Sequence, residues 1–348
     1  MMRFSTVCRY LRAGAVPVAL IALVSFASIA TIAQDGAPEG AQARGQGRAA
    51  AKLSVPEAKV ESNVIYGMYS GLALLMDVYH PMQGSNGLGV IFVHGGHWRM
   101  ALEVGSAPPK TGGNVVQLQA FIQPLVAAGY TVFVPDYRMA PRFHAEAQLE
   151  DIQRAVRFVR FNAKRFGIDP DHIGGAGFSA GSQLISIVGL MDGKPTPHDT
   201  SAVGQTSSKL QCVVAAGTPA NLVENAAVVE DDAFISGFIG DFVTPKISAN
   251  SALYKKLMDA SPVTYVSAGA PPFLLVHAEQ DKEIPIAIVE EFQQALQKAG
   301  SPVKMIRVPD SDHESTFVGE HATVFTAPMV QWYDQYLKAP SKTHDSGN

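Results

Sequence analysis

The sequence predicts an α/β fold with a mostly parallel central sheet and helices on both of its faces. Short apolar runs alternate with longer helical stretches along the chain. The short runs are apolar throughout, rather than at every second residue, as is typical of strands that are buried on both faces. Because 47% of the 348 residues are hydrophobic and 17% are charged, the chain can bury a large core.

The N-terminal segment, residues 1–33, is typical of a secretory signal. Three arginines (Arg3, Arg9 and Arg12) precede an uncharged apolar stretch that ends in small residues. We expect cleavage and export to the periplasm or the extracellular space, with no stable membrane association afterwards. The alternative is an uncleaved membrane anchor, since the apolar stretch is long enough to span a bilayer. Residues 34–58 are rich in Gly, Ala, Pro and polar residues and are expected to form a flexible linker.

A single folded domain is predicted over residues 59–340, followed by a disordered tail at 341–348. The stretches "KVESNVIYG" and "LALLMDVYHP" predict an antiparallel strand pair at a sheet edge. Further strands are expected at 89–94, 131–136, 172–178, 211–217, 272–278 and 304–310. Helices are expected at about 114–128, 145–166, 180–191, 285–299 and 321–337. Residues 218–262 lack this alternation and are expected to form an insertion over one end of the sheet.

Charge and cysteine content exclude several classes of protein. The formal charge of −4 is spread without basic blocks, so nucleic acid is not an expected partner. Cys8 lies in the signal segment and Cys212 is then alone, which excludes an intramolecular disulfide framework. Cys212 lies in the apolar run "LQCVVAAG" and is expected to be a buried strand residue. Nothing in the sequence indicates the oligomeric state.

Ser179 lies in the stretch "GGAGFSAGSQ", between a predicted strand and a predicted helix. A sharp strand-to-helix turn brings backbones so close that glycine is needed at Gly177 and Gly181, and it exposes the serine hydroxyl above the sheet. This pattern predicts a nucleophile. On its own it is also compatible with a glycine-rich turn that carries an incidental serine.

A serine nucleophile needs a histidine base and an acid that orients the histidine, and in sheets of this kind these follow the serine in the order acid, histidine. Asp281 follows the strand at 272–278 and His313 follows the strand at 304–310. We prefer them to the neighbouring acids Glu279, Glu283 and Asp312 and to the other histidines, His277 and His321. His277 is expected to pack beneath the acid loop.

An acyl-transfer site also needs backbone amides that bind the oxyanion. Gly95 and Gly96 follow the strand at 89–94, and Ala180 follows the nucleophile, so their amides are the candidates. The pair His94 and His97 could instead indicate a metal loop. No further cluster completes a ligand set, however, and we expect neither a metal nor an organic cofactor.

The chain resembles the α/β-hydrolase superfamily, and within it the esterases similar to hormone-sensitive lipase and to bacterial feruloyl-esterase-like and acetyl esterases. The resemblance runs from about residue 60 to 338 and is carried by "HGG" (94–96), "DYRMAP" (136–141), "GFSAG" (177–181), "LLVHAEQD" (274–281) and "SDH" (311–313). It implies Ser179, Asp281 and His313 as the catalytic triad. In "DYR", Asp136 and Arg138 are expected to anchor loops through a structural ion pair.

Two departures from the family pattern bear on specificity. His97 stands where close relatives often have a third glycine, and Phe178 stands where the lipase-like branch usually has Asp. The second departure favours the feruloyl- or acetyl-esterase-like side. We expect His97, Trp98 and Phe178 to line the substrate pocket, together with the loop 97–115 and the insertion 218–262. Trp98 could pack on an aromatic acyl group or a sugar, or could fill a hydrophobic gap.

The predicted function is hydrolysis of short-chain acyl or aromatic esters through an acyl-enzyme. The substrate is expected to be a small-molecule ester or one linked to plant polysaccharide. Two alternatives remain at this point. One is an amide hydrolase of the arylformamidase type, whose members have a similar His-Gly-Gly-aromatic loop. The other is a non-catalytic binding module on a hydrolase scaffold.

Overall fold

The computed structural model describes residues 55, 57–99, 118–196, 199–228 and 233–338. The predicted signal segment 1–33, nearly all of the linker 34–58, most of the loop 97–115 and the tail 341–348 lie outside these ranges. Within the described ranges, no helix is both long enough and apolar enough to cross a membrane.

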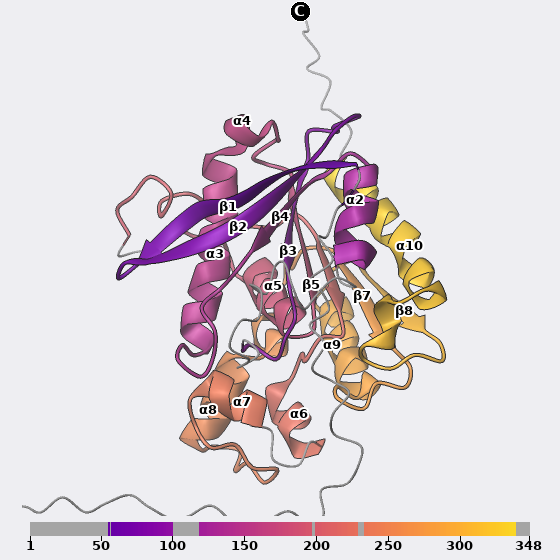
Figure 1. Ribbon diagram of the computed structural model, residues 1–348. Coiled ribbons are helices and arrows are strands. Elements are labelled where there is room, and N and C mark those ends of the chain that lie inside the picture. Colours follow the sequence, from indigo (N-terminus) through magenta and orange to yellow (C-terminus); the bar gives the residue numbers. More distant parts are fainter. Residues whose placement is uncertain (1–54, 56, 100–117, 197–198, 229–232, 339–348) are drawn as a thin grey trace, which may run out of the picture. The chain divides into compact units, whose positions relative to one another are not determined.

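An eight-stranded sheet forms the centre of the described part of the chain (Figure 1). Its spatial order is β1-β2-β4-β3-β5-β6-β7-β8. Strand β2 runs antiparallel to both of its neighbours, and all the other pairs are parallel. The strands are β1 (Ala58–Tyr69), β2 (Leu72–Pro81), β3 (Gly89–Val93), β4 (Thr131–Pro135), β5 (Ile173–Phe178), β6 (Val213–Ala216), β7 (Phe273–Ala278) and β8 (Val303–Val308). The predicted parallel sheet with an antiparallel edge pair is therefore present.

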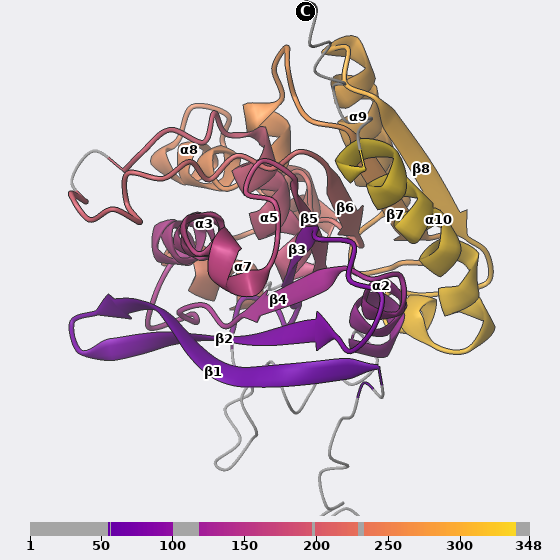
Figure 2. The same ribbon diagram turned by 90° about the horizontal axis from the view of Figure 1, so that it is seen from above.

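Helices cover both faces of the sheet and divide the core into two layers (Figure 2). One face packs against α3 (Ala145–Phe161), α5 (Ala180–Leu190) and α9 (Ile286–Lys298). The other face packs against η1 (Leu118–Ile122), α2 (Gln123–Ala127) and α10 (Glu320–Leu337). Because the central strands are covered on both sides, their residues are buried at every position, which explains the continuous apolar runs.

Two predicted helices differ from the observed ones. The predicted helix 145–166 is interrupted at Asn162, where the backbone leaves helical geometry (φ −98°, ψ 17°), and a short helix α4 (Ala163–Phe166) follows. The predicted helix 114–128 begins outside the described residues, and the part seen consists of the π-helical turn η1 and then α2. Pattern alone cannot place such breaks, because apolar spacing continues across them.

The region 218–262, for which no elements were predicted, contains α6 (Leu222–Val228), α7 (Ala233–Ile239) and α8 (Ala252–Asp259), and the 3₁₀ turn η2 (Pro262–Tyr265) ends it. The three helices gather below the sheet in Figure 1. Pro219, Asn225 and Phe234 from this region share a cavity with Ser179, which follows the carboxyl end of β5. The region therefore lies over the carboxyl ends of the parallel strands.

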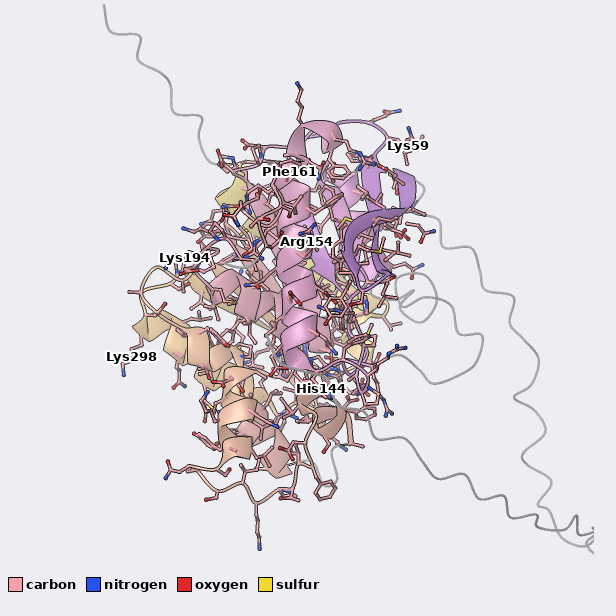
Figure 3. The ribbon with its side chains drawn as sticks, turned by 90° about the vertical axis from the view of Figure 1, so that its left-hand side faces the viewer. Lys59, His144, Arg154, Phe161, Lys194 and Lys298 are labelled. Atoms are coloured by element: carbon pink, nitrogen blue, oxygen red, sulfur yellow. The ribbon has the colours of Figure 1, made fainter. Side chains whose placement is uncertain are left out.

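A buried ion pair ties the segment after β4 to α3. Arg138 Nε donates to Asp151 Oδ1 at 2.9 Å, and the two side chains are only 2% and 1% exposed. Helix α3, which carries Asp151, is labelled in Figure 3 at His144 just before its start, at Arg154 and at Phe161, its last residue. The expected structural ion pair thus has Asp151 as the partner of Arg138. The carboxylate of Asp136 instead lies 3.9 Å from His94 Nε2.

Replacement of Asp151 by Ala is expected to lower the free energy of unfolding by about 3 kcal/mol, because it leaves the guanidinium of Arg138 buried without its main counter-charge. Urea unfolding followed by circular dichroism measures the change. Asp259→Ala is the matched control, since its ion pair with Lys255 is exposed and should contribute little. Equal effects of the two substitutions would contradict this reading of the ion pair.

Candidate active site

Ser179 occupies a strained turn between β5 and α5. Its backbone has φ +51° and ψ −124°, a region that side-chain-bearing residues rarely adopt. A Cβ added to Gly177 would lie 2.6 Å from the carbonyl oxygen of Gly181, and one added to Gly181 would lie 2.1 Å from the carbonyl oxygen of Val93. Only glycine fits at either position, so the predicted close approach of backbones explains the Gly-Phe-Ser-Ala-Gly pattern.

The structure brings Ser179, His313 and Asp281 together although they come from three separate loops. His313 Nε2 lies 3.0 Å from Ser179 Oγ, and His313 Nδ1 lies 2.7 Å from Asp281 Oδ2. Because a carboxylate can only accept, Nδ1–H donates to Asp281 and Nε2 is left to accept from the serine hydroxyl. All three residues are buried. In this arrangement His313 Nε2 can take the hydroxyl proton of Ser179.

Asp281 is held in place by the loop that follows it. Its Oδ1 accepts from the backbone amides of Glu283 at 2.9 Å and Ile284 at 2.8 Å, which leaves Oδ2 for His313. His277 lies beneath the loop, and its Nε2 is 2.9 Å from the carbonyl oxygen of Ile284. Burial lowers the pKa of His277, so a neutral ring donates to that carbonyl. His277 therefore packs where it was predicted to.

Burial also favours the neutral ring of His313, but the hydrogen bond and negative charge of Asp281 outweigh it. The pKa of His313 is consequently raised above its ordinary value of 6.5. Burial acts against ionisation of Asp281 too, yet the hydrogen bond and charge of His313 hold the pKa of that carboxyl below its usual value. The aspartate is thus charged at neutral pH, and it stabilises an imidazolium at His313.

Because only the neutral imidazole can accept the proton of Ser179, kcat/KM should fall with decreasing pH, with an inflection above 6.5. The measurement is a pH profile of ester hydrolysis. Glu283→Gln should move the inflection to lower pH, since the charge of Glu283 also raises the pKa of His313. His97→Gln tests the other imidazole at the site and should leave the inflection in place. An inflection below 6.5 would contradict the assignment.

Gly95 lies beside the nucleophile, and Gly96 follows it in the loop after β3. A Cβ on Gly95 would be 3.0 Å from the carbonyl oxygen of Phe178 and 3.2 Å from Ser179 Cβ, so the loop after β3 runs directly against the turn. Ala180 is the first residue of α5, and its N–H therefore has no partner within the helix. The predicted oxyanion donors thus come from two backbone segments that meet at Ser179.

His94 fixes the orientation of the Gly95–Gly96 peptide. Its Nδ1 lies 2.7 Å from the carbonyl oxygen of Gly95, and its ring stacks on Tyr137 with centroids 4.7 Å apart. Burial lowers the pKa of His94 to about 4, so the ring is neutral and Nδ1–H donates. In a trans peptide the N–H points opposite to the carbonyl, so the amide of Gly96 is directed away from His94. This positioning role of His94 was not predicted, because nothing in the sequence indicates that its ring turns toward the carbonyl of Gly95.

His94 and His97, the two histidines of the metal-loop alternative, point to different partners. His94 is directed at the carbonyl of Gly95, whereas His97 Nε2 is 3.2 Å from Glu283 Oε2. In the described ranges, no group of three or more His, Cys, Asp or Glu side chains could hold a metal ion. Cys212 is buried and unpaired by disulfide, and burial raises the pKa of its thiol well above the usual value.

A cavity of about 450 Å³ opens onto Ser179. Its size is in the range of pockets that bind small organic molecules. The side chains around it come from the loop after β3, the turn after β5, the region 218–262 and the loop after β7. They are His97, Trp98, Ser179, Pro219, Asn225, Phe234, Lys282, Glu283 and Ile284.

His97 and Trp98 line this cavity as predicted, and both adopt positive φ angles of 54° and 57°. The ring of His97 stacks on Phe234 with centroids 4.1 Å apart, and the ring of Trp98 stacks on Phe238 at 4.5 Å. Trp98 Nε1 donates to Gln183 at 3.0 Å. Trp98 is 5% exposed, so it mainly fills the core, although it also lines the cavity.

Phe178 does not line the cavity, which corrects the prediction. It is 2% exposed and packs beneath His313, with ring centroids 4.8 Å apart, and against Phe317 at 4.2 Å. Alternation along β5 directs its side chain into the core layer covered by α10. The region 218–262 contributes to the cavity as predicted, through Pro219, Asn225 and Phe234. The wall residue Ile284 was not predicted, because no periodic pattern in the sequence relates it to the triad.

The chain has the α/β-hydrolase architecture, and the candidate nucleophile, acid and histidine follow β5, β7 and β8, the order that is typical of hydrolases with this fold. The chain belongs to the BD-FAE family, whose model matches residues 76–296. The predicted membership of the esterase group is thereby confirmed.

Individual relatives agree with this assignment. Esterase LipC of Mycobacterium tuberculosis is 28% identical over 253 residues, which cover 72% of this chain and 58% of LipC. The chain spans about three fifths of the length of the curated relatives that it matches. A truncated carbohydrate esterase from gut microbiota has a TM-score of 0.66 at 22% identity over 80% of this chain and 96% of that one. An acetyl ester-xyloside bifunctional hydrolase from Caldicellulosiruptor lactoaceticus has a TM-score of 0.64 at 22% identity, covering 79% and 96%. These likenesses confirm the α/β-hydrolase fold.

Proposed function

We propose that the protein is an exported serine carboxylic-ester hydrolase that acts through an acyl-enzyme. The observation that carries the proposal is the continuous chain of contacts from Ser179 through His313 to Asp281, with Ser179 opening onto a cavity. Membership of the BD-FAE family and the likeness to esterases support ester hydrolysis. The arginines and apolar stretch of residues 1–33 support export.

The reaction follows from the positions of the groups. Ser179 Oγ attacks the acyl carbon while His313 Nε2 takes its proton, and Asp281 stabilises the imidazolium that forms. The amides of Gly95, Gly96 and Ala180 bind the oxyanion of the tetrahedral intermediate. His313 then returns the proton to the departing alcohol, which leaves the acyl group on Ser179. Water activated by the same histidine releases the acid.

We propose short acyl and aromatic acyl groups, such as acetyl or feruloyl, as the substrates. The cavity beside Ser179 has apolar walls formed by Trp98, Phe234 and Ile284, and its volume of about 450 Å³ suits a compact group. The proposal extends to esters of plant polysaccharide. It is supported by the structural likeness to proteins described as a carbohydrate esterase and an acetyl ester-xyloside hydrolase.

An activity panel tests this proposal. It compares p-nitrophenyl acetate, butyrate and octanoate with methyl ferulate, acetylated xylan and N-formylkynurenine. We expect turnover of acetyl and feruloyl esters, release of acetate from xylan and a decline with chain length. A preference for p-nitrophenyl octanoate would overturn the proposal that the substrates carry a compact acyl group. Turnover of N-formylkynurenine without turnover of any ester would contradict ester hydrolysis and would favour an amide hydrolase of the arylformamidase type.

A further inference from the structure

A second cavity, of about 290 Å³, lies beside His313. It lies between the loops that follow β7 and β8, and its walls are Gln280, Lys282, Glu283, Asp312, His313 and Glu314. Lys282 and Glu283 also line the cavity that contains Ser179. The two cavities therefore adjoin each other along the Lys282–Glu283 segment, one at the nucleophile and the other at the base.

The chemistry of ester cleavage assigns different parts of a substrate to these two places, provided that the proposed function holds. When the tetrahedral intermediate collapses, the bond between the acyl carbon and the alcohol oxygen breaks, and the proton held by His313 Nε2 passes to that oxygen. The acyl group stays bonded to Ser179 Oγ, so it occupies the cavity that opens onto Ser179. The alcohol leaves from beside His313 with its oxygen protonated.

The two cavities also differ in chemical character, and the difference matches this division of the substrate into an acyl group and an alcohol. Aromatic and aliphatic side chains dominate the walls at Ser179, whereas every residue around the second cavity is polar or charged. Three of these residues are acidic (Glu283, Asp312 and Glu314), against the single cation Lys282. The hydrogen bond from His97 lowers the pKa of Glu283, and hydrogen bonds from Ser315 lower the pKa of Asp312. Both carboxyls are therefore charged at neutral pH.

Carboxylates accept hydrogen bonds strongly from hydroxyl groups and repel other anions. We propose that the cavity beside His313 is the alcohol subsite, that it accepts uncharged, hydroxyl-rich alcohols, and that it selects against esters whose alcohol carries a negative charge. Asp312 and Glu314 from one loop favour this selection, and Lys282 from the other loop opposes it. A sugar hydroxyl that carries the acyl group has this chemistry, whereas the ester of a hydroxy acid through its hydroxyl group does not.

The test uses two acetate esters that share the acyl group and have leaving groups of similar basicity: 4-(hydroxymethyl)phenyl acetate, which is neutral, and 4-carboxyphenyl acetate, which is anionic. We expect kcat/KM to favour the neutral ester by about tenfold at low ionic strength, since a unit charge about 4 Å away changes a rate roughly fivefold even in water. Addition of 0.5 M NaCl should reduce the ratio, because it screens exposed charges.

Substitutions that remove charges of opposite sign show whether the residues around this cavity determine the ratio. Asp312→Asn and Glu314→Gln should each narrow the ratio several-fold, whereas Lys282→Gln should widen it. Glu279→Gln removes an exposed carboxylate from the same loop as Lys282 that is not among the wall residues, and it should leave the ratio unchanged. Because the readout is a ratio, a disturbance of His313 by the neighbouring substitutions cancels.

The possible outcomes separate this inference from the proposed function. Equal kcat/KM for the two esters, or a ratio that none of the three substitutions moves, would overturn the alcohol subsite while leaving ester hydrolysis intact. If neither ester is hydrolysed and p-nitrophenyl acetate is also inert, the proposed function itself fails, and the subsite falls with it.

Discussion

Replacement of Ser179 by Ala should lower kcat for p-nitrophenyl acetate by a factor on the order of 10⁵–10⁶. The substitution removes the oxygen that forms the acyl-enzyme, while the backbone turn, the oxyanion amides and the cavity remain. Since Ser179 Oγ contacts His313 and makes little packing contribution, the fold should be retained. Steady-state kinetics with circular dichroism as a check of folding measures both effects.

Ser186→Ala is the matched control for this experiment. Ser186 is on the same helix, α5, and is fully buried, and its hydroxyl has no hydrogen-bond partner among the described residues. Its removal should leave both kcat and the fold nearly unchanged. A Ser179→Ala variant that kept more than a tenth of the wild-type kcat would contradict the role of Ser179 and would favour the non-catalytic reading of the scaffold.

Replacement of Asp281 by Asn should lower kcat by about 10³–10⁴-fold. The amide oxygen of the new side chain would take the place of Oδ1, which accepts from the amides of Glu283 and Ile284. Its NH₂ group would then face His313 Nδ1, which must become an acceptor, so Nε2 would carry the proton. In that tautomer His313 cannot accept from Ser179. The residual activity should also have its acidic inflection at lower pH, because the charge that raises the pKa of His313 is gone.

Glu279→Gln and Glu283→Gln distinguish Asp281 from the neighbouring acids. Glu279 is exposed, and the carboxylate of Glu283 contacts His97 rather than His313. Each substitution should cost far less than Asp281→Asn. A small effect of Asp281→Asn beside a large effect of Glu283→Gln would transfer the orienting role to Glu283.

Much of the fold and the triad could be predicted because their signals are local. The central strands are buried on both faces, so each one appears as an uninterrupted apolar run. Ser179 and Asp281 follow two of these runs, β5 and β7, whereas His313 follows β8, which is partly exposed. Parallel strands bring their carboxyl ends to one edge of the sheet. The steric reason for Gly177 and Gly181 is likewise contained in five consecutive residues.

The remaining features depend on contacts between distant parts of the chain. Which acid pairs with Arg138 is decided by the packing of α3, and the sequence offers Glu150 and Asp151 as neighbours. The direction of Phe178 depends on which face of β5 meets α10. Phe234 reaches the cavity through the irregular region 218–262, and nothing in its local sequence distinguishes it from a core residue.

The most direct test of the central claim is the site at which the protein reacts with a fluorophosphonate, which captures an activated serine. After treatment and digestion, mass spectrometry should locate a single added phosphonyl group on the peptide that contains Ser179. The modification should be lost in Ser179→Ala and retained in Ser186→Ala. An unmodified Ser179, or a phosphonyl group on another residue, would contradict the assignment of Ser179 as the nucleophile of a serine hydrolase.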